Sequence, residues 1–168
     1  MNFRAAKKTD ASTLAAISIE VWVGTYLRKG VNAFFADYAL SEFTASRFEA
    51  ILGNRDEHII VSENEVGLDG FIRMTSGKTA PVPGCSTTEI TTLYVQPRHH
   101  GKGIGKGLLQ EGLRKCAADG VPSLWLAVNS ENTSAIDFYL APGFQNVGQT
   151  HFRIGEEAYL NEVLARAV

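Results

Sequence analysis

The pattern of apolar and polar positions divides the chain into helix-like and strand-like segments. Helical spacing after a Thr9-Asp10 cap predicts an opening helix that carries Leu14, Ile17 and Trp22. The same reasoning predicts helices over 41–52, 103–118 and 133–140. Short alternating or continuous apolar runs predict strands over 3–6, 58–62, 70–74, 87–95, 123–128, 144–154 and 159–168.

The order of these segments predicts the fold class. It reads strand, two helices, three strands, helix, strand, helix and a closing strand pair, joined by a turn at Gly155-Glu156-Glu157. Such an order is typical of a mixed α/β domain. With 168 residues and no repeat or low-complexity tract, the chain is expected to form one domain over residues 1–168. The aromatic-rich stretch over 23–38, broken by Gly30, is expected to pack in the core.

Composition excludes several classes of protein. Hydrophobic residues at 45% and charged residues at 20% are ordinary for a soluble globular protein. A net charge of -2 gives no general basic field, so nucleic acid is not expected as a partner. No apolar run is long enough for a membrane span, and we expect a cytoplasmic protein without a membrane partner.

The two cysteines are too far apart to suggest a metal site, and none is expected. Cys116 falls on the apolar stripe of a predicted helix and is expected to be buried, whereas Cys85, in a Pro/Gly-rich loop, is expected to be exposed.

The most informative stretch joins the strand over 87–95 to the helix over 103–118. Pro97 ends the strand, and the basic run Arg98-His99-His100-Gly101-Lys102-Gly103-Ile104-Gly105-Lys106 opens the helix. A helix N-terminus presents unpaired N–H groups and the positive end of the helix dipole to an anion, and glycines let the backbone approach closely. Lys102 and Lys106 add positive charge. We interpret the run as a cradle for a diphosphate, with a tight surface turn as the alternative.

Two familiar phosphate motifs fit this run poorly. A Walker loop needs a hydroxyl after its lysine, and Lys106 is followed by Gly107. A dinucleotide fingerprint is met loosely at Gly101 and Gly103, but the loop lies past mid-chain and lacks the acidic ribose-binding residue at the expected distance.

The run resembles motif A, [QR]-x-x-G-x-[GA], of the GNAT superfamily of acyl-CoA-dependent N-acyltransferases. The matching segment is His100-Gly101-Lys102-Gly103-Ile104-Gly105, in which His100 departs from the usual Gln or Arg. A second segment resembles motif B, N-x-x-A-x-x-F-Y-x-[KR]-x-G-F, at Asn132, Ala135, Phe138, Tyr139, Gly143 and Phe144, with Ala141 in place of the basic residue. Capping by Asn132 and core packing by Phe138 explain part of this match.

The resemblance implies a fold and a donor site. The fold would be a mixed, mostly antiparallel sheet of about seven strands flanked by about four helices, with splayed central strands that form the acyl-CoA site. The donor would be acetyl-CoA. Its expected contacts are the backbone of Leu93, Tyr94 and Val95, the loop residues His100, Gly101, Lys102, Gly103, Ile104, Gly105 and Lys106, and Asn132 and Phe138 of the second motif.

The resemblance also implies catalytic roles. The N–H of Leu93 would stabilise the oxyanion, and Tyr139 would protonate the departing thiolate, since a tyrosine holds its proton at neutral pH. Glu89 is the candidate base for the amine. It lies four residues before Leu93, on the same face if the strand alternates regularly, but about 13 Å away, so that a water or a bulge would have to close the gap. A carboxylate on a half-exposed strand is the alternative. Direct attack in a ternary complex is expected, without an acyl-enzyme on Cys116.

For the acceptor, a primary amine, the resemblance is less specific. Trp22 and Tyr26 are expected to line its pocket, and the tail from His151 to Glu157 resembles that of bacterial polyamine acetyltransferases. Glu20, Glu156 and Glu157 would suit a polycation, although they could equally be solvated. A peptide or protein amine, an amino acid and an aminoglycoside stay open.

Two other functions stay open at this point, as does a homodimer. A non-catalytic acyl-CoA-binding sensor would keep the glycine loop without proton-transfer residues. A nucleotide hydrolase would need a magnesium-binding hydroxyl that the loop lacks.

Overall fold

The computed structural model describes residues 1–168 and contains seven strands in one sheet, in the order β1-β2-β3-β4-β5-β7-β6. The strands are β1 (Asn2–Ala5), β2 (Glu57–Glu63), β3 (Leu68–Thr75), β4 (Glu89–Val95), β5 (Ser123–Asn129), β6 (Gln145–Ile154) and β7 (Glu157–Ala167). The helices are α1 (Ala11–Tyr26), α2 (Ala33–Glu42), α3 (Ala45–Leu52), α4 (Ile104–Ala118) and α5 (Thr133–Leu140), with 3-10 turns η1 (Lys8–Asp10) and η2 (Pro97–His99). The predicted mixed α/β class is confirmed.

The chain forms two compact units. The first comprises Met1–Met74 and Thr92–Gly112, and the second comprises Thr75–Thr91 and Leu113–Val168. Strand β4 and helix α4 therefore each contribute residues to both units. The loop that follows β4 belongs to the first unit, and α5 belongs to the second.

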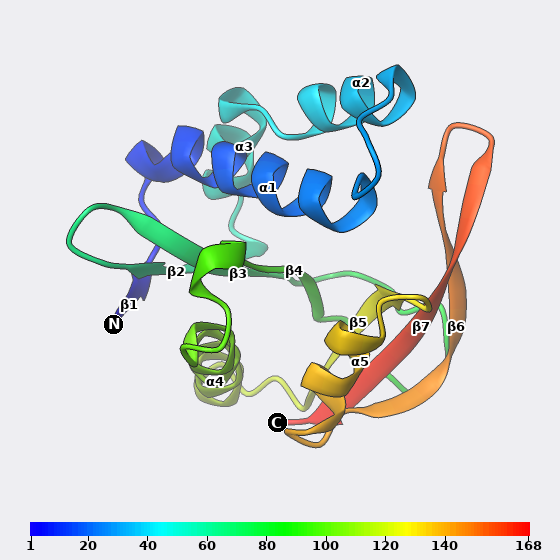
Figure 1. The fold of residues 1–168 in the computed structure, drawn as a ribbon. Helices are drawn as coiled ribbons and strands as arrows, with labels where there is room; N and C mark the ends of the chain where they lie inside the picture. The colour runs from blue at the N-terminus through cyan, green and yellow to red at the C-terminus, as the bar shows by residue number, and fades with distance from the viewer. The chain divides into compact units, whose positions relative to one another are not determined.

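In the first unit, α1, α2 and α3 lie on one side of the strands and α4 begins on the other side (Figure 1). Strand β1 pairs antiparallel with β2, with Asn2 opposite Glu63 and Ala5 opposite Ile60. One apolar core joins Leu14 and Ile17 of α1 to strand residues such as Val61 and Phe71. Burial of these side chains drives the two layers together.

The structure separates two helices where the sequence predicted one over 41–52. Asn32 caps α2 by accepting a hydrogen bond from the N–H of Phe35, and Thr44 caps α3 by accepting one from the N–H of Arg47. Because Thr44 has an extended backbone, the chain cannot continue as a single helix through it. The sheet is therefore flanked by five helices rather than about four, and the stretch over 23–38 is divided between α1, which runs to Tyr26, and α2.

In the second unit, β5 pairs antiparallel with β7 from Ser123 opposite Ala167 to Asn129 opposite Asn161. Strands β6 and β7 form a long hairpin, which is twisted in Figure 1 and has a register shift between Asn146 and Gly148. The first residue of the predicted strand over 159–168 moves to Glu157, so the connecting turn is Gly155-Glu156.

None of the helices has both the length and the hydropathy needed to cross a membrane. Cys116 is buried as predicted, whereas Cys85 is half-buried rather than exposed.

Candidate active site

The glycine run folds into a tight turn followed directly by α4. Two of its residues, Gly101 and Gly103, have φ angles of 75° and 79°, in the left-handed region that side chains disfavour. A Cβ added to either glycine would meet no atom within 4 Å, so the backbone conformation, not crowding, requires glycine there. The open space beside them is available to a ligand.

The start of α4 leaves backbone donors unpaired within the helix. The N–H of Gly107 donates to the carbonyl of Gly103 at 2.9 Å, which is the first bond of the helical ladder. The N–H groups of Ile104, Gly105 and Lys106 precede that bond and have no acceptor inside the helix. With the positive end of the helix dipole, these donors give the start of α4 the features that favour an anion.

The departure at His100 has a structural role. Its ring Nε2 lies 2.9 Å from the carbonyl oxygen of Val95 and donates to it across the turn. The Nζ of Lys102 lies 3.2 Å from Nδ1 of His99, so this lysine is held against the same turn. The side chain of His100 thus closes the loop on the end of β4.

Strand β3 provides a reference for the faces of the sheet in this region. A Cβ on Gly70 would lie 3.3 Å from Leu108 of α4, and a Cβ on Gly112 of α4 would lie 3.1 Å from both Ile72 and Met74. Even-numbered residues of β3 therefore face α4 throughout, as regular alternation requires. The odd-numbered residues face the opposite side.

Strand β4 does not alternate regularly against this reference. Thr91 Oγ1 lies 2.7 Å from Thr75 Oγ1, and the ring of Tyr94 lies 5.8 Å from that of Phe71. Thr91 and Tyr94 therefore share the face of the odd-numbered residues of β3, although they are three positions apart. Strand β4 therefore departs from regular alternation between Thr91 and Tyr94.

This irregularity bears on the prediction for Glu89. That prediction placed Glu89 and Leu93 on one face by regular alternation, and the irregularity lies between Thr91 and Tyr94, so their common face stays a prediction. Glu89 is opposite Trp125 in the parallel pairing of β4 with β5, so these two side chains share a face of the sheet. Glu89 is half-buried there.

The second motif forms α5 and the residues after it. Asn132 caps the helix by accepting a hydrogen bond from the N–H of Ala135 at 3.2 Å. Tyr139 is 8% exposed, and its ring lies 5.1 Å from that of Phe138 and 5.6 Å from that of Phe144. Burial raises the pKa of the Tyr139 phenol above its ordinary value. Tyr139 therefore keeps its proton at neutral pH.

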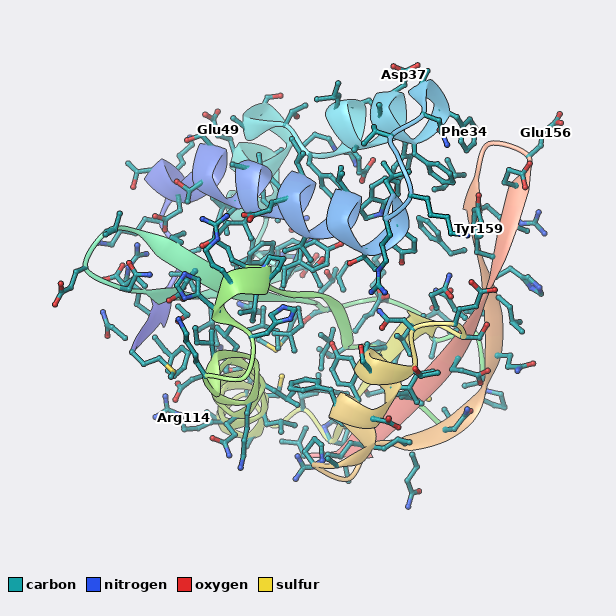
Figure 2. All side chains as sticks on the ribbon, in the orientation of Figure 1. Phe34, Asp37, Glu49, Arg114, Glu156 and Tyr159 are labelled. Carbon is teal, nitrogen blue, oxygen red and sulfur yellow. The ribbon has the colours of Figure 1, made fainter.

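An aromatic cluster surrounds Trp22 on α1. Its ring lies 5.0 Å from that of Tyr26, 5.1 Å from Tyr38 and 5.8 Å from Phe35. Trp22 is only 4% exposed, whereas Tyr26 is 43% exposed. Trp22 therefore supports the cluster from within, and Tyr26 offers a surface. Phe34, labelled on α2 in Figure 2, is a second exposed aromatic ring of this unit, although the aromatic stretch over 23–38 was expected to pack in the core.

The acidic residues assigned to a polycation have different surroundings. Glu20 is already engaged: its carboxylate accepts hydrogen bonds from Gln96 and Arg98 at the turn after β4. Glu156 and Glu157 are exposed near the β6–β7 turn, where Figure 2 shows Glu156 pointing away from the strands. Glu20 joins elements 76 residues apart, and no local pattern in the sequence signals such a contact.

The first unit contains the glycine loop, the end of β4 from Leu93 to Val95, Trp22 and Tyr26. The second unit holds Glu89, Asn132, Phe138 and Tyr139. No group of three His, Cys, Asp or Glu side chains is placed to hold a metal ion. Burial raises the pKa of the Cys116 thiol, so this cysteine is not activated as a nucleophile.

Comparison with known proteins identifies the family. Residues 25–144 match the sequence profile of the acetyltransferase (GNAT) family. An uncharacterized N-acetyltransferase of Mycobacterium bovis is 26% identical over 158 residues, which cover 94% of this chain and 97% of that protein. The N-alpha-acetyltransferase RimI of Mycobacterium tuberculosis is 37% identical over 97 residues, 56% of either chain.

Solved structures share the fold over the whole chain. The PaiA N-acetyltransferase of Thermoplasma acidophilum, crystallised with coenzyme A, superimposes with a TM-score of 0.78 at 20% identity, with both chains fully covered. The chain therefore belongs to the acetyltransferase (GNAT) family, whose reaction, acetyl transfer from acetyl-CoA to an amine, is the one that its two motifs predicted.

Proposed function

We propose that this enzyme transfers the acetyl group of acetyl-CoA to a primary amine by direct attack in a ternary complex. The observation that carries the proposal is the start of α4, where three helix N–H groups without helical acceptors follow two left-handed glycines in a motif of this family. Those residues fit a diphosphate by charge and by the space beside the glycines.

In this proposal the loop residues bind the donor. The N–H groups of Ile104, Gly105 and Lys106 donate to the diphosphate, and Lys102 adds positive charge beside it. His100, which replaces the usual Gln or Arg of the motif, holds the turn closed through its hydrogen bond to Val95 and is not assigned a contact with the donor. Asn132 and Phe138 are proposed to contact the donor from the second motif. Asn132 Oδ1 is engaged as the cap of α5, which leaves its amide N–H groups for a ligand.

The backbone of β4 is proposed to orient the thioester. The departure of β4 from regular alternation between Thr91 and Tyr94 supports this proposal, because an irregularity in a strand disrupts the ladder of backbone hydrogen bonds locally. We assign the oxyanion contact to the N–H of Leu93, which lies in this segment. A single preorganised donor of this kind contributes about 10²- to 10³-fold in rate.

Two side chains move protons in the proposed reaction. As the amine nitrogen bonds to the carbonyl carbon and the carbon–sulfur bond breaks, the phenol of Tyr139 gives its proton to the sulfur. Its raised pKa supports this role because the phenol is protonated before the reaction begins. Glu89 is proposed to accept the proton that the amine loses, through water. Its place beside Trp125, on a half-buried strand face, supports a carboxylate set apart from bulk solvent.

A polyamine is the first acceptor to test and a peptide α-amine the second. The aromatic ring of Tyr26 supports a cationic acceptor, which cation–π contacts would favour. Glu20 no longer supports it, because Gln96 and Arg98 occupy its carboxylate. Similarity to an N-alpha-acetyltransferase over 97 residues supports the peptide.

The test is thiol release from acetyl-CoA with spermidine, a lysine peptide and a peptide with a free α-amine, for the natural protein and Tyr139→Phe. The substitution removes only the hydroxyl and keeps the ring between Phe138 and Phe144. We expect turnover with at least one amine and a fall in kcat of about 10²- to 10⁴-fold in the variant. Binding of coenzyme A, measured by calorimetry, should stay unchanged in the variant.

Binding of coenzyme A without turnover of any amine would instead favour the non-catalytic sensor. A Tyr139→Phe variant with the natural kcat would remove Tyr139 from the mechanism.

A further inference from the structure

Glu20 connects α1 to the turn that leads into the glycine loop. Its Oε2 accepts a hydrogen bond from Gln96 Nε2 at 2.7 Å, and its Oε1 accepts one from Arg98 NH2 at 2.8 Å. One carboxylate thus holds two side chains that bracket Pro97. Charge-assisted bonds of this kind are among the stronger hydrogen bonds in proteins.

The backbone of the same turn is fixed from β3 and by its own bonds. The N–H of Gln96 donates to the carbonyl of Asp69 at 2.9 Å. The N–H of His99 donates to Gln96 at 2.9 Å, and the N–H of His100 donates to Pro97 at 3.2 Å. The position of Gln96 therefore sets that of His100, the residue directly before Gly101.

We propose that Glu20 is a positioning residue for binding of the acyl donor. Its carboxylate holds the turn after β4 in the conformation that binds the donor, before the donor arrives. This inference rests on the proposed function. A loop that is already ordered loses less conformational entropy on binding, so removal of the carboxylate should weaken donor binding even though Glu20 touches no donor atom. The pair is partly solvated, with 33% of the Glu20 side chain and 68% of that of Arg98 exposed, so it contributes little to global stability.

A competing account gives the opposite sign. If Glu20 merely occupies Arg98, then its removal would free a guanidinium beside the phosphate site and tighten donor binding. The direction of the change therefore separates positioning from sequestration.

The test uses the full chain and measures coenzyme A binding by calorimetry, without an amine, for Glu20→Ala, Glu20→Gln and Glu49→Ala. Glu49 is the matched control, since it is exposed on α3 and points away from the unit in Figure 2. We expect about tenfold weaker binding in Glu20→Ala, from the loss of hydrogen bonds to a charged group, and partial recovery in Glu20→Gln, which keeps one acceptor oxygen. Binding should not change in Glu49→Ala.

Kinetics give a readout that a general loss of stability would not produce. The KM for acetyl-CoA should rise in Glu20→Ala, while kcat at saturating acetyl-CoA should stay within about twofold because the proton-transfer groups are untouched. An Arg98→Ala change, at an exposed side chain, should weaken binding in the same direction and add little to Glu20→Ala in the double variant.

Binding by Glu20→Ala as tight as, or tighter than, that of the natural protein would overturn the positioning role and leave the proposed acetyl transfer intact. Failure of the natural protein to bind coenzyme A would count instead against the proposed function.

Discussion

Single residues in this chain have roles that depend on backbone geometry and on partners distant in sequence. The left-handed conformations of Gly101 and Gly103 were foreseeable, because glycines in a basic loop before a helix indicate them. The hydrogen bond from His100 to Val95 was not, since a histidine pattern does not specify its acceptor. Glu20 was assigned to the acceptor, and the structure pairs it with the donor-side turn. In these cases the residue type indicated the chemistry, whereas the hydrogen-bonding partner of each side chain was known only from the folded structure.

A pH-dependent ion pair in the first unit gives a prediction at this scale. Asp10 accepts hydrogen bonds from Arg4 at 2.8 and 3.1 Å, and the Arg4 bonds hold the pKa of this carboxyl below its usual value. A lowered pKa gives stability that is present above the unfolded-state pKa of about 3.9 and is lost as the pH falls through the folded-state pKa. Asp10→Asn should therefore lower the free energy of unfolding by about 1–3 kcal/mol at pH 7.

The measurement is urea unfolding of the natural protein and Asp10→Asn from pH 7 down to the acid limit of folding. The difference between them should shrink as the pH falls below the unfolded-state pKa of about 3.9 toward the lowered pKa of the folded carboxyl. A difference that stays constant with pH would show that the lowered pKa does not contribute to stability.

Secondary structure elements were predictable in type, and their irregularities were not. The helix over 133–140 is confirmed to its ends as α5, because Asn132 provides a recognisable cap. The single helix predicted over 41–52 is divided between the end of α2 and α3. The apolar periodicity continues through Thr44, but Thr44 is the N-cap of α3 and interrupts the helix. The irregular alternation in β4 has no proline or glycine to mark it. It is shown only by the contacts of Thr91 and Tyr94 with β3.

The packing of α4 on β1 gives a prediction at the scale of elements. A Cβ on Gly107 would lie 2.3 Å from Cζ of Phe3, so this glycine lets the helix approach the strand. Alanine is favoured over glycine within a helix by about 1 kcal/mol. We nevertheless expect Gly107→Ala to lower the free energy of unfolding by about 1–3 kcal/mol, because the ring must move.

A double-mutant cycle in urea isolates this contact. In a Phe3→Leu background, which removes the distal ring atoms, Gly107→Ala should become neutral or stabilising. If Gly107→Ala stabilises the protein with Phe3 in place, then the helix can shift without loss and the close packing is not required.

At the scale of the whole molecule, the family and the reaction class followed from two motifs, while the acceptor did not. The donor loop can be recognised from glycines that lie close together in the sequence, which is a local signal. The exposed aromatic rings of Tyr26 on α1 and Phe34 on α2 come from separate elements, and their exposure is visible only after folding. The two motifs lie in different units, with the loop in the first and α5 in the second.

This division predicts where coenzyme A should slow amide hydrogen exchange. At about 100 times Kd the ligand should stabilise the protein by roughly 2.7 kcal/mol, and exchange should slow both over residues 95–106 and over α5. Mass spectrometry of the full chain with and without coenzyme A resolves the two segments. Slower exchange over residues 95–106 alone would remove Asn132 and Phe138 from the donor site.

The hydrogen bond from His100 to the end of β4 bears on how relatives of this chain are recognised. Gln, Arg and His share a nitrogen donor at or near the end of the side chain, and an imidazole protonated on Nε2 donates whether it is neutral or charged. In this chain the first position of the motif therefore provides a hydrogen-bond donor that reaches back to a carbonyl. A search pattern written for Gln or Arg alone passes over this sequence, and one that admits His at that position finds it.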